Sequence, residues 1–191
     1  MSQQELLAKV AQVLQQAGLE FMITGSFVSS MQGEPRASHD IDVVVELTQT
    51  GASALLAAFT SPDYYLDEHA IRSAMNAQGA FRQFNLLDIS QGNKVDFWIL
   101  SDDPFDQSRF ARKHVDSIEG LAVPVSRPED TILMKLRWAD MSGGSEKQVV
   151  DALRVFEVQA KRLDLAYMEH WATQLRVLPL WERIQREAKP L

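Results

Sequence analysis

The chain has 191 residues, of which 46% are hydrophobic, so it is long enough for one domain with a full core and a small appended unit. It contains no cysteine, which excludes disulfides, a thiol nucleophile and a zinc site with cysteine ligands. The net charge of −7 argues against a general nucleic-acid surface. No apolar run is long enough to span a membrane and no signal peptide is evident, so the sequence predicts a cytoplasmic protein with no membrane contact.

The first 125 residues alternate between helix and strand patterns. In chain order we expect an amphipathic helix over 2–18, a strand over 21–23, a helix from residue 25, a strand over 40–46, helices over 48–59 and 68–77, a hairpin of 81–89 and 94–100, a helix over 103–113 and a second hairpin of 114–118 and 121–125. This order predicts an α/β domain.

From Ser126 onward the pattern is helical. Pro128 and Glu129 mark a helix start, and we expect helices over 129–139, 146–160, 163–175 and 178–187. The predicted domains are therefore 1–125 and 126–191. An apolar stripe in the last two helices, which includes Leu165, Met168 and Trp181, is expected to be core. The alternative for this stripe is a contact face for a protein partner or a second subunit.

Two carboxylates, Asp40 and Asp42, lie within an otherwise apolar strand pattern. Alternate residues of a strand point to the same face, so their side chains would lie roughly 6.5 Å apart on one side of the sheet. At an effective dielectric constant of about 20 they would repel each other by about 2–3 kcal/mol. A divalent cation would neutralise this repulsion. A half-exposed edge strand explains the same alternation without any ligand.

The segment before this strand has features of an anion site. The strand-like 21–23 is followed by Gly25-Ser26, which opens a helical pattern. Glycine permits close backbone approach, serine caps helices, and the free N–H groups of a helix N-terminus bind anions. An ordinary strand-to-helix turn is the alternative. Arg36, in the following loop, is either a phosphate ligand or a solvated loop residue.

These pieces together resemble the signature of the nucleotidyltransferase superfamily, whose members have a polymerase-β-like fold. The pieces are Gly25-Ser26, a spacer that includes Arg36, the Asp40-Ile41-Asp42 strand and a lone Asp96 in the strand-like KVDFWIL. They occur in the family's order and cover the chain up to Leu100. The resemblance implies a mixed sheet flanked by helices, followed by a C-terminal helical subdomain.

The resemblance also implies roles for these residues. Asp40, Asp42 and Asp96 would be catalytic carboxylates that bind two Mg²⁺ ions, with Mn²⁺ as a substitute, and Asp96 would assist deprotonation of the acceptor hydroxyl. Gly25 and Ser26 would bind the β- and γ-phosphates of a nucleoside triphosphate.

The third carboxylate has alternatives. Asp96 could be an exposed hairpin residue, and Asp88 on the facing strand is a weaker rival for the same role.

A second similarity lies in the helical part. Residues 132–136 and 147–151 are similar to later motifs of the abortive-infection toxin branch of the superfamily, in which a helix lysine lies beside the nucleotide. By this resemblance Lys135 would contact the triphosphate or the base; a partly buried interface lysine is the alternative. Gln148 departs from that branch, which more often has an acidic residue there. Asp151 fits a packing or ion-pair role better than a catalytic one.

The sequence therefore predicts a metal-dependent nucleotidyltransferase that moves a nucleoside monophosphate from a nucleoside triphosphate to an acceptor hydroxyl and releases pyrophosphate. The acceptor is left open among a small molecule, a protein and a tRNA. The alternative function is a catalytically inactive nucleotide-binding or toxin–antitoxin partner protein of the same fold. A purely structural protein explains the carboxylate pair but not the turn and the third aspartate together.

Overall fold

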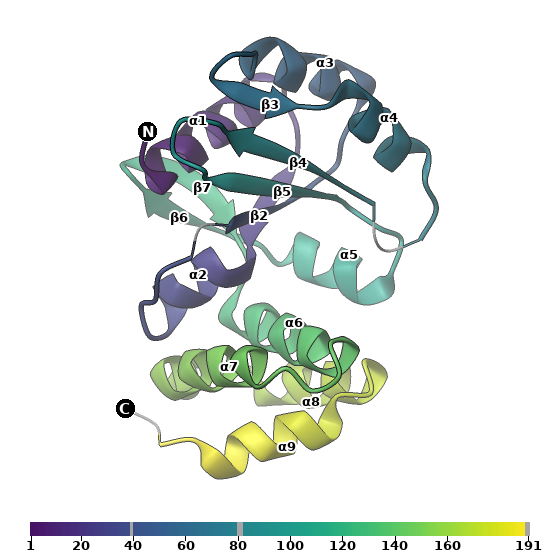
Figure 1. Ribbon diagram of the computed structural model, residues 1–191. Helices are drawn as coiled ribbons and strands as arrows, with labels where there is room; N and C mark the ends of the chain where they lie inside the picture. Colours follow the sequence, from purple (N-terminus) through teal and green to yellow (C-terminus); the bar gives the residue numbers. More distant parts are fainter. Residues whose placement is uncertain (39, 80–81, 190–191) are drawn as a thin grey trace. The chain divides into compact units, whose positions relative to one another are not determined.

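The computed structural model describes residues 1–38, 40–79 and 82–189 (Figure 1). The chain divides into two compact units. The first comprises Met1–Thr24 and Ser38–Val125, and the second comprises Gly25–Ala37 and Ser126–Leu191. A division between residues 125 and 126 is expected from the sequence, but Gly25–Ala37 groups with the C-terminal helices and not with the strands on either side of it.

The first unit is built on a mixed sheet, which has seven strands within the described ranges, in the order β3-β4-β5-β2-β1-β7-β6. The strands are β1 (Phe21–Thr24), β2 (Asp40–Val45), β3 (Tyr64–Leu66), β4 (Gln83–Asp88), β5 (Lys94–Ile99), β6 (His114–Ile118) and β7 (Leu121–Val125). The helices of this unit are α1 (Gln3–Gln16), α3 (Gln49–Ala58), α4 (Glu68–Asn76) and α5 (Pro104–Ala111). The expected mixed sheet flanked by helices is confirmed.

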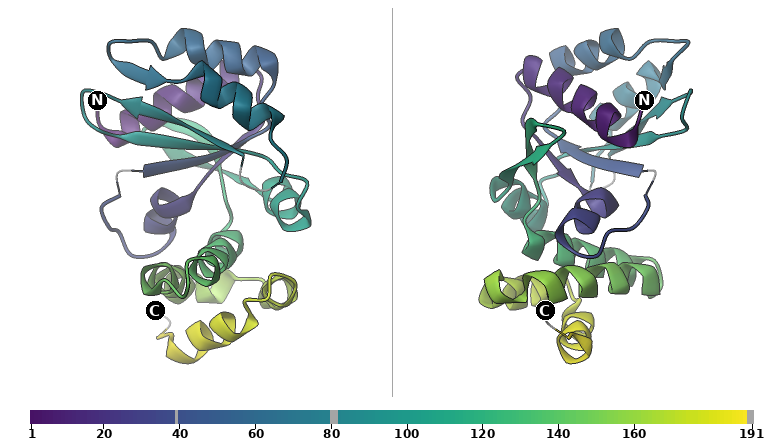
Figure 2. Two further views of the ribbon diagram at one scale, coloured as in Figure 1. Left: turned by 45° about the vertical axis from the view of Figure 1, so that its right-hand side comes forward. Right: turned by 90° about the vertical axis from the view of Figure 1, so that its left-hand side faces the viewer.

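Strand alternation assigns the residues of β2 to two faces of the sheet. Ile41, Val43 and Val45 are fully buried on one face, and Figures 1 and 2 show α1, α3 and α4 on one side of the sheet and α5 on the other. Val44 packs against Phe110 of α5. The face of β2 that carries Asp40 and Asp42 is therefore the face on which α5 lies.

Local sequence signals account for the starts of several helices. Ser2 and Glu5 form a capping box at the start of α1, in which each side chain accepts a hydrogen bond from the backbone of the other. Asp103 caps α5, and proline occupies a first-turn position of both α5 and α6. These are the residues from which the helices were expected.

The described part of the second unit is helical. Its elements are α2 (Gly25–Gln32), α6 (Pro128–Met141), α7 (Glu146–Gln159), the short 3-10 helix η1 (Ala160–Arg162), α8 (Leu165–Gln174) and α9 (Leu178–Glu187). Met168 and Trp181 of the predicted stripe are buried, and the Trp181 ring meets Phe156 edge to face at 5.4 Å between ring centroids. Leu165 is exposed, so the stripe is core only in part.

The segment around α2 is held to the C-terminal helices by hydrogen bonds from side chains to backbone carbonyls and by a close backbone approach. Gln32 donates from Nε2 to the carbonyl of Ser126 at 2.7 Å, and Gln159 donates to the carbonyl of Gln32 at 2.8 Å. A Cβ on Gly33 would lie only 2.8 Å from the backbone nitrogen of Val155 in α7. Close backbone approach therefore requires glycine at the end of α2.

Two structural results differ from, or limit, the sequence expectations, and a third concerns the membrane. The edge strand β3 was not expected, because three residues are too few to show an alternating pattern. Phe81, the expected start of the first hairpin, lies outside the described residues, and β4 begins at Gln83. In the described ranges no helix is both long and apolar enough to cross a membrane.

We expect Gly33→Ala to lower the free energy of unfolding by about 1–3 kcal/mol, because the added methyl group meets the α7 backbone. Urea denaturation of the purified protein measures this change. Met31→Ala, at an exposed position of α2, is the control and should cost less than about 0.5 kcal/mol. Equal stability of Gly33→Ala and the unaltered protein would contradict the close packing of this segment on α7.

Candidate functional site

The three predicted metal-binding carboxylates lie on adjacent strands of the first unit. Strands β2 and β5 pair in parallel, with Asp42 opposite Asp96 and Asp40 opposite Lys94. Residues that face each other across a strand pair point to the same side of the sheet, so all four side chains share one face. Neighbouring strands are separated by about 4.8 Å. We call these four residues, Asp40, Asp42, Lys94 and Asp96, the carboxylate site.

Lys94 is the cation of the carboxylate site. Its Nζ lies 2.8 Å from Oδ2 of Asp96 and 3.6 Å from Oδ1 of Asp40. The hydrogen bond to Asp96 raises the pKa of Lys94 above its usual value, although partial burial acts against this change. The lysine therefore stays charged near neutral pH and offsets part of the repulsion between the carboxylates.

The carboxylates differ in their surroundings. Asp42 accepts a hydrogen bond from Nε1 of Trp98 at 3.1 Å, which fixes one of its oxygens. Asp96 is buried, and its Oδ1 has no hydrogen-bond partner among the residues that the structure describes. Asp40 is more than half exposed. Strand β5 lies between β2 and β4, and Asn85 of β4 pairs with Asp96 from the side opposite to β2.

The carboxylate site fits a divalent cation in its chemistry and its register. Carboxylate oxygens are the ligands that Mg²⁺ prefers, and a buried oxygen without a partner is the kind of atom that a metal satisfies. As the side chains lie, however, no three His, Cys, Asp or Glu residues of the described part of the chain are grouped closely enough to hold a metal ion. Lys94 lies between two of the carboxylates instead.

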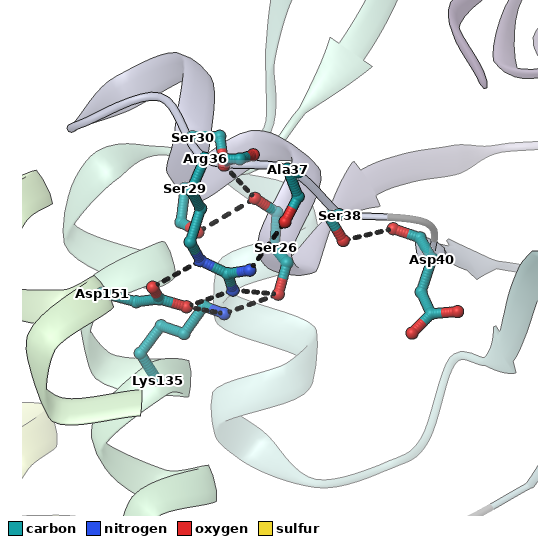
Figure 3. A network of polar contacts seen from close by, with 9 residues as sticks. All are labelled: Ser26, Ser29, Ser30, Arg36, Ala37, Ser38, Asp40, Lys135 and Asp151. Carbon is teal, nitrogen blue, oxygen red and sulfur yellow. Dashed lines mark hydrogen bonds and ion pairs between the residues drawn. The ribbon is translucent and has the colours of Figure 1, made fainter. Parts of the chain in front are cut away.

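The second unit contains a separate polar cluster, which we call the Asp151 cluster and which consists of Ser26, Arg36, Lys135 and Asp151 (Figure 3). Arg36 donates from Nε to Oδ1 of Asp151 at 2.8 Å and from Nη2 to Oδ2 at 2.7 Å. Lys135 donates to the same Oδ2 at 2.8 Å. Both cations also donate to Oγ of Ser26, at 2.9 and 3.0 Å. Three residues predicted to bind nucleotide therefore meet around one carboxylate.

Burial and charge compete within the Asp151 cluster. Burial acts to raise the pKa of Asp151, but the hydrogen bonds and charges of Arg36 and Lys135 outweigh it and hold the pKa below its usual value. The hydrogen bond to Asp151 also raises the pKa of Arg36. Lys135 is buried, so it depends on Asp151 for charge compensation. The expected ion-pair role of Asp151 is confirmed.

Gly25 begins the helix that carries Ser26. Its φ of 73° lies in the left-handed region, which glycine adopts without strain. The preceding residue, Thr24, lies opposite Asp42 in the β1–β2 pair. The glycine thus permits the sharp turn from the strand into α2.

Asp88, the rival third carboxylate, has a different role. It lies on the sheet face opposite to that of Asp96, because Asn85 and not Asp88 is the β4 residue that faces Asp96. Its Oδ1 accepts hydrogen bonds from the backbone N–H groups of Ser90 and Gln91 and from the Ser90 hydroxyl. Burial acts to raise its pKa, but these hydrogen bonds lower it overall. Asp88 therefore stabilises the β4–β5 turn and does not share a face with the other three carboxylates.

A family model described as aminoglycoside-2''-adenylyltransferase matches residues 6–136, which is more than half of the chain. The chain belongs to the aminoglycoside-2''-adenylyltransferase family. Membership of the nucleotidyltransferase superfamily, expected from the sequence, is thereby confirmed. The match ends at Leu136, so it includes the carboxylate site and Lys135 but not Asp151. No curated protein matches the chain.

Solved structures of nucleotidyltransferases share the fold. The solution structure of the antibiotic-resistance factor ANT(2'')-Ia has a TM-score of 0.56 at 13% identity and covers 97% of this chain and 96% of its own. ANT(2'')-Ia in complex with adenylyl-2''-tobramycin gives 0.59 at 14%, with coverage of 92% and 98%. An antigenic nucleotidyltransferase-like protein from Paracoccidioides brasiliensis gives 0.55 at 14%, with coverage of 99% and 94%.

The family that matches differs from the branch suggested by residues 132–151. The chain is assigned to the adenylyltransferase family, whereas the similarity to abortive-infection toxins rests only on the sequence motifs.

Two residues that contact the carboxylates, Lys94 and Trp98, were not assigned a role from the sequence. Lys94 and Trp98 flank Asp96 at i−2 and i+2, so strand alternation alone places them on the same face as Asp96. Their contacts with Asp40 and Asp42, in contrast, depend on the pairing of β2 with β5, which the sequence does not reveal.

We expect Asp151→Asn to lower the free energy of unfolding by about 3 kcal/mol at neutral pH, because it leaves two cations without their carboxylate. The double variant Lys135→Met/Asp151→Asn should be less destabilised, since it removes the buried ammonium as well. Urea denaturation measures both, with the exposed Asp140→Asn as the control on α6. A double variant no more stable than Asp151→Asn would contradict the proposed charge compensation.

The stabilisation by Asp151 should depend on pH. Since its folded-state pKa lies below the unfolded value, the stabilisation is fully present above about pH 5 and is lost as the pH falls through the folded-state pKa. The stability difference between the unaltered protein and Asp151→Asn, measured by urea denaturation from pH 7 down to pH 3, should therefore shrink in acid. A difference that is constant over this range would refute the assignment.

Proposed function

We propose that the chain is a metal-dependent nucleotidyltransferase that moves a nucleoside monophosphate from a nucleoside triphosphate to an acceptor hydroxyl. The observation that carries this proposal is the β2–β5 register, in which Asp42 faces Asp96 and Asp40 lies on the same face. Family membership supports the reaction class. Three carboxylates on one sheet face have no evident structural purpose, because they repel one another.

In this proposal Asp40, Asp42 and Asp96 hold two Mg²⁺ ions, or Mn²⁺ in their place. Bound divalent ions stabilise the charge on the attacking and leaving oxygens of a phosphoryl transfer. Trp98 orients Asp42 through its indole N–H. We assign Asp96 to assist deprotonation of the acceptor hydroxyl.

The residues Gly25, Ser26, Arg36 and Lys135 are the proposed contacts to the donor nucleotide. Arg36 and Lys135 lie side by side at the carboxylate of Asp151, and cationic side chains of this kind suit phosphate oxygens. Asp151 holds both cations toward the Ser26 hydroxyl. Helix α2 begins at Gly25, and the first N–H groups of a helix also favour an anion.

The reaction we propose exchanges one phosphorus–oxygen bond for another. The acceptor oxygen forms a bond to the α-phosphorus. The bond between the α-phosphorus and the oxygen that bridges the α- and β-phosphates breaks, and pyrophosphate leaves with the electron pair. The hydroxyl proton passes to Asp96. ATP is the donor to test first, given the family description.

An aminoglycoside is the first acceptor to test. The family is described by adenylyl transfer to an aminoglycoside, and one structure of the same fold holds adenylyl-2''-tobramycin. The net charge of −7 would attract such a polycation. Protein and tRNA acceptors belong in the same screen.

A second function, a nucleotide-binding protein or toxin–antitoxin partner without turnover, is favoured by one observation. Lys94 pairs with two of the three carboxylates and so occupies part of the proposed metal site. Thermal shift with ATP, with and without Mg²⁺, separates the two functions. An inactive binder should be stabilised equally in both conditions, whereas the enzyme should be stabilised more with Mg²⁺.

We expect Asp42→Asn and Asp96→Asn each to lower the rate of nucleotidyl transfer by at least about 100-fold, because each removes charge that the metal ions require. Labelled ATP, Mg²⁺ and a panel of aminoglycosides measure this rate. The exposed Asp63→Asn, which removes a carboxylate from the same unit, is the matched control and should keep full activity. Equal labelling by Asp42→Asn and the unaltered protein would remove the assignment.

A further inference from the structure

The carboxylate site contains its own cation. Asp40 on β2 lies opposite Lys94 on β5, and Asp42 lies opposite Asp96. The four side chains thus form a square with three acidic residues and one lysine. With carboxylates and lysine ionised, the square keeps an excess of two negative charges. Lys94 alone therefore does not balance the three carboxylates of the site.

The ammonium group lies where a divalent ion would bind. Its Nζ is within hydrogen-bond distance of Asp96 Oδ2 and close to Asp40 Oδ1, which are oxygens of two proposed metal ligands. Metal and ammonium cannot contact the same oxygens from the same side at once. Lysine has three donors on a flexible four-carbon stem, and this side chain is about one third exposed (31%), so it has room to move away.

We propose that Lys94 is the resident cation of the metal-free carboxylate site and that a divalent ion must displace its ammonium group to bind. Lys94 thereby sets the metal concentration at which the site becomes loaded. This inference rests on the proposed function, because it takes the three carboxylates as metal ligands.

Two consequences follow from this exchange. Without metal, Lys94 stabilises the folded chain by offsetting repulsion within the square. With metal, the same residue weakens binding, because each bound ion must compete with the ammonium group. Removing the charge at residue 94 should therefore change the two properties in opposite directions, which a merely structural lysine would not do.

The test measures Mn²⁺ binding to the nucleotide-free protein. The electron paramagnetic resonance signal of the unbound ion gives the bound fraction. Lys94→Met removes the charge and keeps an unbranched stem, and we expect it to bind Mn²⁺ about ten-fold more tightly than the unaltered protein. Lys94→Arg keeps the charge and should bind no more tightly than the unaltered protein. Lys113→Met is the matched control: Lys113 pairs with Glu20 at 3.0 Å in the same unit, and its loss changes the net charge equally.

Thermal unfolding gives an independent readout. In the presence of a chelator Lys94→Met should have a lower midpoint than the unaltered protein, and the rise in midpoint on adding Mn²⁺ should be larger for the variant. Lys113→Met should show the same Mn²⁺-induced rise as the unaltered protein.

The outcomes separate this inference from the proposed function. The exchange is supported if Lys94→Met binds Mn²⁺ more tightly than the unaltered protein and neither Lys94→Arg nor Lys113→Met does. This holds even when binding to the unaltered protein is too weak to measure. Equal or weaker binding by Lys94→Met overturns the exchange and leaves the proposed function intact as long as Asp42→Asn abolishes both Mn²⁺ binding and transfer. Absence of Mn²⁺ binding by the unaltered protein and by Lys94→Met, together with unchanged transfer by Asp42→Asn, overturns the proposed function itself.

Discussion

The parallel pairing of β2 with β5 is the constraint on which the candidate site depends. It brings two acidic positions of one strand beside a third from a segment more than fifty residues further along the chain. The hydrogen bonds of the ladder fix this arrangement, so the side chains cannot separate to relieve their repulsion. The charge that compensates them must come from a side chain on the same face or from a bound ion, and here Lys94 contributes part of it.

The Asp151 cluster follows the same principle with the signs reversed. There one carboxylate stands between two cations, so the cluster has an excess of positive charge where the carboxylate site has an excess of negative charge. Buried charges survive in a folded chain only with partners. Each cluster therefore brings charges of opposite sign into direct contact.

Much of the fold could be predicted from the sequence because its signals are local. Alternation in β2, the Gly25-Ser26 turn and the proline-marked start of α6 each depend on neighbouring residues, and each is found where expected. The short β3 carries too few residues for such a signal. The grouping of Gly25–Ala37 with the C-terminal helices was not foreseen, since it depends on contacts with residues more than ninety positions away, such as Gln32 with Ser126. For the site, sequence reasoning named the acidic and basic residues but not their partners, because Lys94 and Trp98 look like ordinary strand residues until the register is known.

The position of α2 in the chain has a consequence for how the protein can be divided. In the sequence, α2 lies between β1 and β2, which are neighbours in the sheet, but in the structure it packs on α6 and α7. The backbone therefore passes from one unit to the other at residues 24–25, 37–38 and 125–126. A fragment that stops at Val125 would retain α2 but lose α6 and α7, the helices on which it packs. The helical region is thus not a detachable accessory, and an exchange of the C-terminal half between relatives would have to include residues 25–37.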